Sequence, residues 1–464
     1  MWFYRLNAIL RHAKDNRIRE RVFMSDKGIR DARTLGYPKM LLLGFQHMFA
    51  MFGATVLVPA LTGLSVSVTL LFAGLGTLLF HLLAKGKVPA FLGSSFAFIY
   101  GYTHVAELLG VYPEIANWIP YAGVGVACAG LLYVALAGLF RIFGPEKVMR
   151  YFPPIVTGPV IISIGMTLAN SAVNNCNDNW WIALLAIVIV IACNIWGRGM
   201  IKIVPILLGV VGSYAVAAIC GMVDFTPVKE AAWIGLPVVW DETVFSLAGN
   251  CNPGALVSAI SVMVPIALAT IVEHIGDMCA ISSTVGENYI KSPGLHRTLL
   301  GDGLATSMAA LFGAPANTTY GENTGVLALT RVFDPVVIRI AAVLAILFSF
   351  SPKFATLVSC MPAGTIGGVS LILYGMISAV GVRNVVENRV DFTKTRNVII
   401  AALIMSLSLG ITFSNDGALI LGAVRLSGLA VGALVGIFLN AVLPGNDYRF
   451  GTNEQGDESV NFKV

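Results

Sequence analysis

The sequence predicts an all-α, polytopic membrane protein of about 14 spans, arranged as a 7+7 inverted repeat. Composition is the first reason, because hydrophobic residues make up 56% of the chain and charged residues only 12%, with a mean hydropathy of +0.80. A soluble globular protein carries about 25% charged residues. The other two reasons are the side on which basic loops fall and a match between the two halves of the chain.

Apolar segments of near the length that a bilayer requires, about 20 residues, recur along the chain. The expected spans are 40–61, 66–83, 89–98, 119–140, 153–172, 180–195 and 203–222, then 255–281, 299–312, 317–331, 336–350, 362–380, 398–413 and the end of 417–443, which starts as a short interfacial helix around Arg425. Span three (89–98) is too short and too rich in small residues for a plain helix, and span ten (317–331) opens with a polar stretch. Irregular backbone at membrane depth requires protein or a water-filled cavity around it. We therefore interpret the start of span ten as a broken span that lines a substrate site.

Basic residues predict the orientation. Residues 1–39 hold ten Lys and Arg against four Asp and Glu, and no apolar stretch there is long enough for a signal peptide, so they form a basic cytoplasmic leader. The other basic clusters fall on the same side as the leader under this span count: 85–87, 141–150, 198–202, 291–297, 331–339 and 383–396. Both termini are therefore expected in the cytoplasm, with 223–253 as an external loop and 447–464 as a disordered polar tail.

The charge and the cysteines exclude several function classes. The basic leader adjoins a membrane span, which favours a lipid surface over nucleic acid as its partner. The seven cysteines show no metal or redox spacing. Cys176 and Cys251 fall in expected external loops, where a disulfide or two unpaired thiols are both open. No nucleophile–base set and no metal cluster is found, so neither an enzyme nor a cofactor is predicted.

Three short motifs recur in the same order about half a chain apart. The matched pairs are Phe45-Gln46-His47 with Val272-Glu273-His274, Ser94-Ser95-Phe96 with Thr318-Thr319-Tyr320, and Phe152-Pro153 with Met361-Pro362. Because each half has an odd number of spans, the second half is inverted in the membrane. Inverted repeats with paired broken spans are typical of secondary transporters, whose substrate site lies near the midplane.

Three carboxylates in apolar spans are the candidates for chemistry. Glu273 in span eight and Glu322 in span ten are costly at membrane depth unless each faces a cavity or a partner. Burial disfavours the charged form, so either side chain could bind and release a proton during transport; the alternative is a structural carboxylate bonded to nearby backbone. Asp277 lies four residues after Glu273 and on the same helix face, so it is either a proton-relay partner or a hydrogen-bonded brace.

The histidines favour support between spans rather than a metal site. His47 and His274 lack a second His at zinc spacing, and we expect both to be hydrogen-bonded to other spans. Gln46 is either a structural amide or part of the ligand network. Ser95 and Asn323, beside the two broken spans, complete this predicted supporting network.

Aromatic residues on or near the broken spans indicate the substrate class. Phe96, Tyr320 and Tyr374 could stack on a flat, polar heterocycle while carboxylates accept its N–H groups. Gly321 would let the backbone approach such a ligand closely. A lone membrane aromatic is more often a packing residue, but Phe96 and Tyr320 occupy matched positions of the repeat.

At these residues the chain resembles the nucleobase–ascorbate transporter family, and within it the bacterial uracil permeases. The matching segments are Gln46 to Val56, Gly93 to Phe98, Glu273-His274, Asn317 to Gly325 and Val369 to Gly375. They are spread over spans one to twelve, nearly the whole transmembrane part of the chain.

The resemblance implies a core domain, a gate domain and short antiparallel strands in spans three and ten. The implied division is a leader 1–39, core 40–143 and 254–351, gate 144–222 and 352–446, external loop 223–253 and tail 447–464. It also implies uracil import by proton symport, with a homodimer formed through the gate domains. Glu273 and Glu322 would bind the base, the backbone at Phe96 and Gly321 would contact it, and Phe96, Tyr320 and Tyr374 would line the site.

Two residues bear on subtype. Family members that transport purines often have Gln where Glu322 stands, so Glu favours uracil over xanthine or urate. Some uracil permeases have His where Asp277 stands, which leaves the order of the proton relay open. An anion transporter or channel of the same architecture is a further alternative, but it would require a cationic residue where spans three and ten meet, and the sequence has acids there.

Overall fold

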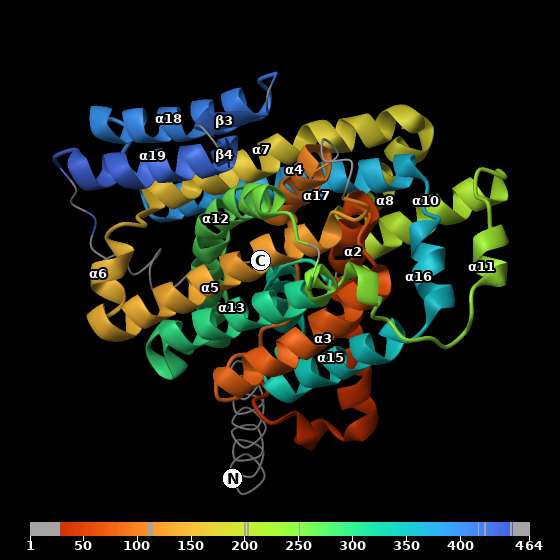
Figure 1. Cartoon of the computed structure of the whole chain (residues 1–464). Coiled ribbons are helices and arrows are strands. Elements are labelled where there is room, and N and C mark those ends of the chain that lie inside the picture. Colours follow the sequence, from red (N-terminus) through yellow and green to blue (C-terminus); the bar gives the residue numbers. More distant parts are fainter. Residues whose placement is uncertain are drawn as a thin grey trace, which may run out of the picture.

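The computed structural model describes residues 28–448 except 110–114, 199–200, 202–203, 250, 416, 422–423 and 446–447. The expected leader before residue 28 and almost all of the expected disordered tail lie outside these residues. The chain is mostly helical, with two small sheets (Figure 1).

The first half of the chain holds nine described helices and one strand. They are α2 (Tyr37–Thr62), α3 (Val66–Leu83), β1 (Leu92–Ser94), α4 (Ile99–Leu109), α5 (Ile119–Phe143), α6 (Pro145–Met149), α7 (Pro154–Asp178), α8 (Trp180–Ile195), α10 (Pro205–Ile219) and α11 (Thr226–Glu230). Two 3-10 helices, η1 (Ala32–Leu35) and η2 (Phe96–Phe98), precede α2 and α4.

The second half repeats this order. It contains α12 (Pro253–Val285), α13 (Leu295–Leu311), β2 (Asn317–Thr319), α14 (Gly321–Thr330), α15 (Pro335–Ser349), α16 (Pro352–Ser359), α17 (Ala363–Glu387), α18 (Thr395–Thr412), β3 (Ala418–Leu421), β4 (Val424–Ser427) and α19 (Gly428–Val442). Short helical turns η3 (Trp240–Glu242), η4 (Val244–Leu247) and η5 (Ile290–Gly294) lie in the connections.

Local sequence explains where the spans begin and end. The side-chain oxygens of Ser65, Asn179 and Asn252 accept hydrogen bonds from backbone N–H groups in the first turns of α3, α8 and α12. Gly63 and Gly286 end α2 and α12 in the left-handed conformation that glycine adopts readily. As a result, α3 and α8 have the bounds expected for spans two and six.

The described helices account for a multi-pass membrane protein. Seven are long and apolar enough to cross a bilayer, or eight if α15 and α16, bent by 88°, count as one span. Shorter apolar helices α8, α10 and α19, together with α13 and the strand–helix segment β2–α14, lie at the remaining expected spans except span three. Span three was predicted to end at residue 98, but its helical part, α4, follows that residue and continues to Leu109. In β1–α4 and β2–α14 a strand and a helix together form the segment.

Elements at corresponding places in the two halves make corresponding contacts. α5 packs against α13, and its counterpart α15 packs against α3, the counterpart of α13. α7 packs along its own counterpart α17, while α8 on α17 is matched by α18 on α7. The packing thus has the approximate two-fold symmetry of an inverted repeat.

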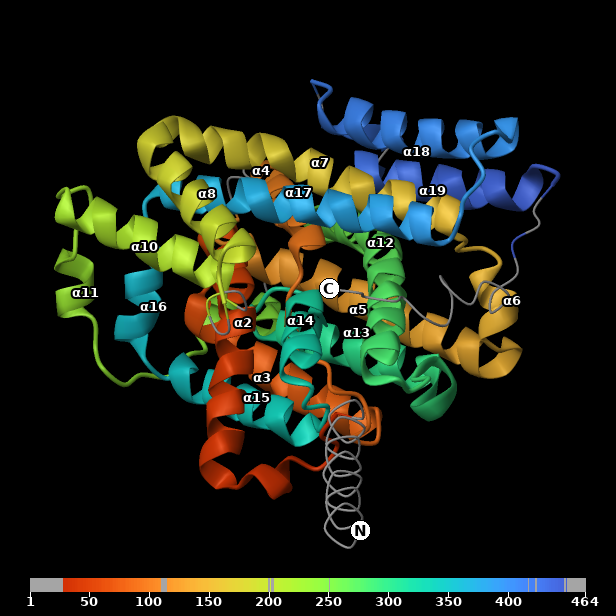
Figure 2. The same cartoon turned by 180° about the vertical axis from the view of Figure 1, so that it is seen from behind.

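The helices form two packed groups. α7, α8, α10, α17, α18 and α19 pack with one another in the upper part of Figures 1 and 2, and α3, α5, α13 and α15 pack together below them. α2 and α12 lie between these layers. The upper group comes from segments expected to form the gate and the lower group from segments expected to form the core. The division into two domains that move against each other stays a prediction.

Glycine lets α7 and α17 approach closely. A Cβ on Gly381 would lie 2.6 Å from the backbone nitrogen of Ile162 and 2.7 Å from the carbonyl oxygen of Gly158. Backbone atoms cannot rotate away as a side chain does, so the helices would have to separate. Small residues at such contacts are typical of membrane helix pairs.

Gly381→Ala is therefore expected to lower stability by about 1–3 kcal/mol, the usual cost of overpacking. Thermal unfolding of detergent-solubilised protein measures this effect. Gly375→Ala in the same helix is the matched control, because nothing lies within 4 Å of a Cβ placed there. Equal melting temperatures for the two variants would contradict this account of the α7–α17 contact.

The end of the predicted leader docks on the rest of the chain. Ile29 forms a parallel β-bridge with Val332, and the backbone N–H of Ala32 donates to Asp334 Oδ2 at 2.8 Å. Arg30 forms an ion pair with Glu287, just after α12. The segment before α2 is thus attached to the ends of α12 and α14.

The expected external loop between spans five and six is wrong. Residues 174–179 were expected to be an external loop, but α7 continues to Asp178, which buries Cys176 in a helix while Cys251 is exposed. Both cysteines are free, so the disulfide alternative is excluded in this structure.

The expected interfacial helix around Arg425 is also wrong. The strands β3 and β4 form an antiparallel hairpin there, with Ile420 opposite Arg425. Gly417, with a φ of 60°, precedes the hairpin, and Ser427 is the N-cap of α19. The run between them is too short for a stable isolated helix, and pairing two strands satisfies backbone groups that a single turn would leave open.

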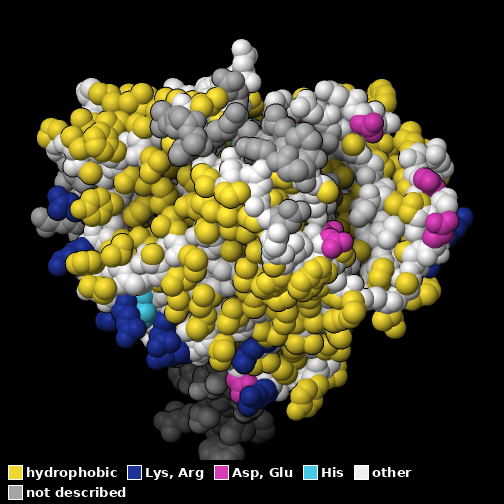
Figure 3. Space-filling model, in the orientation of Figure 1, with side chains coloured by type: hydrophobic (Ala, Val, Ile, Leu, Met, Phe, Trp, Pro, Cys, Tyr) yellow, Lys and Arg dark blue, Asp and Glu magenta, His cyan; other side chains and the backbone are white. Residues whose placement is uncertain are grey.

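The surface separates charge from apolar side chains. In Figure 3 hydrophobic side chains cover most of the face shown, Lys and Arg gather at its left and lower left, and acidic side chains lie mainly on the right. Large apolar residues are highly exposed on many helices, among them Trp181, Ile195, Ile142 and Phe438. Such exposure is expected where lipid rather than water is the neighbour.

Candidate functional site

The site is built around the small sheet that joins the two halves. β1 and β2 pair in antiparallel fashion, with Gly93 opposite Thr318. The pairing is extended by Ser95, whose backbone N–H donates to the Ala316 carbonyl at 2.8 Å, and by Tyr320, whose N–H donates to Phe91 at 3.0 Å. The two broken spans thus satisfy much of each other's irregular backbone in the middle of the protein.

Side chains satisfy further backbone groups of this sheet. The hydroxyl of Thr77 accepts from the N–H of Leu92 at 2.9 Å, and that of Thr306 donates to the carbonyl of Asn317 at 2.9 Å. His81 Nε2 lies 2.8 Å from the carbonyl oxygen of Ala90. These supporting residues were not predicted; their sequence signal was a polar side chain in an otherwise apolar span.

A helix begins directly after each strand. η2 and then α4 follow β1, and α14 follows β2, so two helix N-termini start beside the sheet. The first N–H groups of a helix have no partner within it and carry a partial positive charge. Hydrogen-bond acceptors of a ligand, such as carbonyl oxygens, would therefore be stabilised there.

α12 brings two carboxylates to the break, the region where β1, β2 and the first residues of η2 and α14 meet. It packs against η2, β2 and α14. Asp277 Oδ2 accepts a hydrogen bond from the hydroxyl of Thr319 at 2.7 Å, and Asp277 Oδ1 would lie 3.8 Å from a Cβ on Gly321. Asp277 is thus a brace that ties α12 to β2, one of its two predicted roles, while the relay role stays a prediction.

The structure describes the side chain of Glu273 but not that of Glu322. Glu273 is half-buried, has interaction partners and lies one turn before Asp277 on the same face of α12. Glu322 is the second residue of α14, beside Gly321 at the helix N-terminus, and its side chain lies outside what the structure describes. The backbone places both residues around the break, as expected for the site.

Two of the three predicted aromatics meet, and the third has another contact. The ring of Phe96 in η2 lies edge-on to Tyr374 of α17, with centroids 6.3 Å apart and planes at 78°. The Tyr320 hydroxyl instead donates to the carbonyl oxygen of Ser94 at 2.8 Å and lies 3.3 Å from the Thr55 hydroxyl. Tyr320 therefore joins β1 to β2 and α2, while Phe96 and Tyr374 join the two packed helix groups beside the break.

His47 contacts another span; its supporting role in the site stays a prediction. Asn323 Nδ2 donates to the carbonyl oxygen of His47 at 3.1 Å and lies 3.2 Å from His47 Nδ1, which ties α14 to α2. Gln46 beside it is buried. The contact joins span one in the first half of the chain to span ten in the second half.

His274 has a partner that was not predicted. Its Nδ1 lies 2.9 Å from Asp302 Oδ2 of α13, and neither side chain is exposed. The edge of Phe80 packs against the same imidazole, with centroids 6.3 Å apart. A charged residue between Gly301 and Gly303 in an apolar segment was the available signal for Asp302.

No group of three or more His, Cys, Asp or Glu side chains within the described ranges could hold a metal ion. The described contacts of the acidic groups around the break are with protein side chains: Asp277 with Thr319, and Asp302 with His274. What this arrangement can do is bind a small ligand through backbone and carboxylate hydrogen bonds, and hold or release protons on carboxylates.

Comparison with known proteins decides the family. A family model described as "Permease family" matches residues 38–417. The uracil permease of Bacillus subtilis (strain 168) is 40% identical over 442 residues, covering 92% of this chain and 98% of that protein. This chain belongs to the nucleobase–ascorbate transporter family of permeases. The uracil permease of Bacillus caldolyticus is 41% identical over 428 residues, covering 90% of this chain and 94% of that protein.

The fold of this permease occurs in solved structures of low sequence identity. The transmembrane domain of a cyanobacterium bicarbonate transporter, BicA, has a TM-score of 0.59 at 14% identity, covering 89% of this chain and 99% of that chain. The murine anion transporter Slc26a9 in its inward-facing state has a TM-score of 0.58 at 11% identity, covering 91% of this chain and 71% of that chain. The predicted 7+7 inverted repeat is confirmed by this fold and by the paired contacts of the two halves.

Proposed function

We propose that this permease imports uracil across the cytoplasmic membrane by proton symport. The choice of uracil as the substrate is supported by the similarity of this chain to curated uracil permeases over nearly its full length. The break around the paired strands β1 and β2 offers the groups that a pyrimidine base requires. Helix N-termini can donate to its carbonyl oxygens, and carboxylates can accept from its ring N–H groups.

Several residues around the break would bind uracil together. The N–H groups at Phe96 and Gly321 would donate to uracil carbonyls, and Glu322 would accept from a ring N–H. Phe96 and Tyr374, already in edge contact, would border the ring. Tyr320 would hold β1 and β2 in register through Ser94 rather than only stack on the base.

Proton coupling would use the carboxylates of α12 and α14. A proton on Glu273, Asp277 or Glu322 would remove a charge from the break and favour the substrate-loaded state. The expected core domain, which includes α2 and α12, would then move against the expected gate domain, which includes α7 and α17, so that the site opens on the other side. The edge contact between Phe96 and Tyr374 spans these groups and would change during that movement.

The orientation and assembly belong to the same proposal. On the face shown in Figure 3, Lys and Arg lie mainly at one side and acidic residues mainly at the other, which by the positive-inside rule supports cytoplasmic termini. A homodimer would form through α7, α17, α18 and α19 in the bilayer. Lipids and protons would be its other partners.

Anion transport is the second candidate, supported by the fold of BicA and Slc26a9. The charges around the break argue against anion transport. No Lys or Arg lies in the elements that form it, which are β1, η2, β2, α14 and α12, whereas α12 carries Glu273 and Asp277. Binding of labelled uracil to the purified protein, in competition with thymine, xanthine, urate and bicarbonate, separates the candidates. Competition by xanthine would broaden the substrate range to purines, whereas an absence of uracil binding, with bicarbonate binding measured separately, would contradict the proposal.

Glu322→Gln is expected to weaken uracil binding at least about tenfold, because a charged acceptor becomes a weaker neutral one. Equilibrium binding of labelled uracil to purified variants is the measurement. Glu107→Gln is the control, since that carboxylate is exposed near the far end of α4. Unchanged affinity in the Glu322 variant would remove this side chain from the site.

A further inference from the structure

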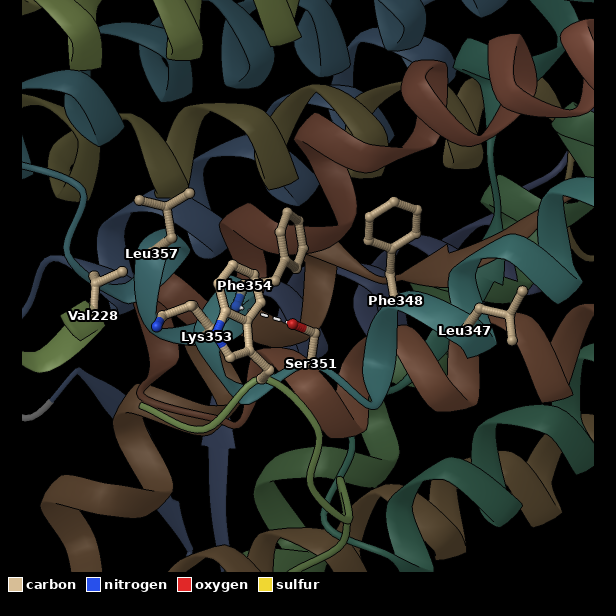
Figure 4. Close-up of a pocket in the computed structure, with 8 residues that line it drawn as sticks. Val228, Leu347, Phe348, Ser351, Lys353, Phe354 and Leu357 are labelled. Atoms are coloured by element: carbon tan, nitrogen blue, oxygen red, sulfur yellow. Dashed lines mark hydrogen bonds between the residues drawn. The ribbon is translucent and has the colours of Figure 1, made fainter. Parts of the chain in front are cut away.

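An apolar groove lies where α11 and the connection through α16 meet the end of α15 (Figures 1 and 4). Its volume of about 530 Å³ is in the range of pockets that hold organic ligands. The apolar lining comprises Leu347, Phe348, Phe354, Leu357, Val228 and Trp233. None of these residues belongs to the uracil site proposed above.

Backbone hydrogen bonds hold the walls of this groove in place. The N–H of Gly235 donates to the carbonyl oxygen of Phe350, and that of Lys353 donates to Ala232, each at 3.0 Å. The 88° bend between α15 and α16 forms the corner of the recess. The external segment and the bent helix pair therefore make one supported surface.

The lining contains one charged side chain. Lys353 Nζ lies 4.5 Å from the centre of the Trp233 ring. Ser351, the other polar lining residue, uses its hydroxyl to cap α16 by accepting from the N–H of Phe354 at 3.4 Å. A polar heterocycle would leave most of its hydrogen-bonding groups unmatched here, whereas a long apolar chain with one anionic group matches the lining.

The surroundings of the groove are those of a membrane boundary. Trp233 is 74% exposed and Trp240 is 66% exposed, and Ile234 and Leu236 between them are exposed even more. Tryptophan is enriched at the level of lipid headgroups. α16 crosses the direction of α15, so it runs close to the plane of the bilayer, as amphipathic interfacial helices do.

We propose that this groove binds one anionic phospholipid, with an acyl chain along the apolar lining and its phosphate on Lys353. Charge complementarity selects the anionic headgroup, and the apolar lining selects the chain. The site would lie on the α15–α17 connection, at the outer side of the protein.

Photolabelling of the intact protein tests the proposal. The protein is placed in nanodiscs of phosphatidylcholine that contain traces of phosphatidylglycerol with a photoactivatable acyl chain, and labelled peptides are mapped by mass spectrometry. We expect labelling of peptides that contain Leu347 to Leu357 or Val228 to Trp233. Phosphatidylcholine with the same reactive chain should label them less.

Lys353→Gln is expected to reduce the phosphatidylglycerol labelling about fivefold, since a lysine near an anionic lipid contributes roughly 1 kcal/mol. Lys229→Gln is the matched control, because Lys229 is an exposed lysine on α11 outside the lining. Leu357→Trp, which fills the groove, should reduce the labelling with Lys353 intact.

The proposal would be overturned if both lipids labelled these peptides equally and Lys353→Gln left the labelling unchanged. Labelling spread over all apolar helices would also overturn it. Crosslinks to a second copy of the chain at these peptides, in place of lipid, would also overturn it. None of these readouts depends on transport, so the lipid site and the uracil proposal can fail separately.

Discussion

Glu273→Gln is expected to abolish accumulation of uracil driven by a proton gradient, with a smaller effect on uracil binding. Glutamine keeps the size and a hydrogen-bonding oxygen but cannot exchange a proton with the pathway. Glu273 lies one helical turn from Asp277, which is fixed to β2 through Thr319 at 2.7 Å. The measurement is uracil uptake by proteoliposomes with an inward proton gradient, beside uracil binding to the same variant.

The matched control is Glu230→Gln, which removes a carboxylate from the exposed end of α11. It should retain gradient-driven uptake. If the Glu273 variant accumulates uracil as well as the unmodified protein does, Glu273 has no part in coupling, and Asp277 and Glu322 become the remaining candidates.

Asp302→Ala is expected to have the largest effect on stability, about 3–5 kcal/mol, because removing one partner leaves the other buried and unpaired. Asp302 and His274 are both fully buried, 2.9 Å apart. Thermal unfolding of detergent-solubilised protein measures the loss. Asp302→Asn should be milder, since an amide still offers an oxygen to the imidazole.

A double-mutant cycle separates the pair from general damage to α13. His274→Leu combined with Asp302→Leu removes both polar groups, and should be more stable than either single change. Additive losses would show that the two side chains do not stabilise each other. Because His274 follows Glu273 directly, a single change at Asp302 should also alter uptake more than the double change does.

Most of the fold could be predicted because a bilayer imposes span length and local residues mark helix ends. Ser65 and Asn179 cap α3 and α8 at the expected first residues. The hairpin β3–β4 was missed because its apolar residues suit a short helix as well as a strand, and only pairing distinguishes them. α16 was missed because an eight-residue helix carries too little periodicity.

The site was predictable in its residue types but not in its contacts. Gln46, His47, Phe96, Glu273 and Gly321 all lie on elements that meet around the β1–β2 break. The partner of a polar residue depends on which helices pack together, so the sequence indicated a hydrogen-bonded His274 without identifying Asp302.

Tyr320 shows the same limit. Its place beside the break was evident from the sequence. Its hydroxyl is held by the Ser94 carbonyl on the paired strand, and the antiparallel register that creates this contact is a property of the folded chain.

The most direct test of the central claim is labelled uracil uptake by proteoliposomes with and without an inward proton gradient, with a protonophore and excess unlabelled xanthine in parallel. We expect accumulation that follows the gradient, ceases with the protonophore and is unaffected by xanthine. Uptake that equilibrates equally with and without the gradient would contradict proton symport, and the coupling roles of Glu273, Asp277 and Glu322 would be rejected with it.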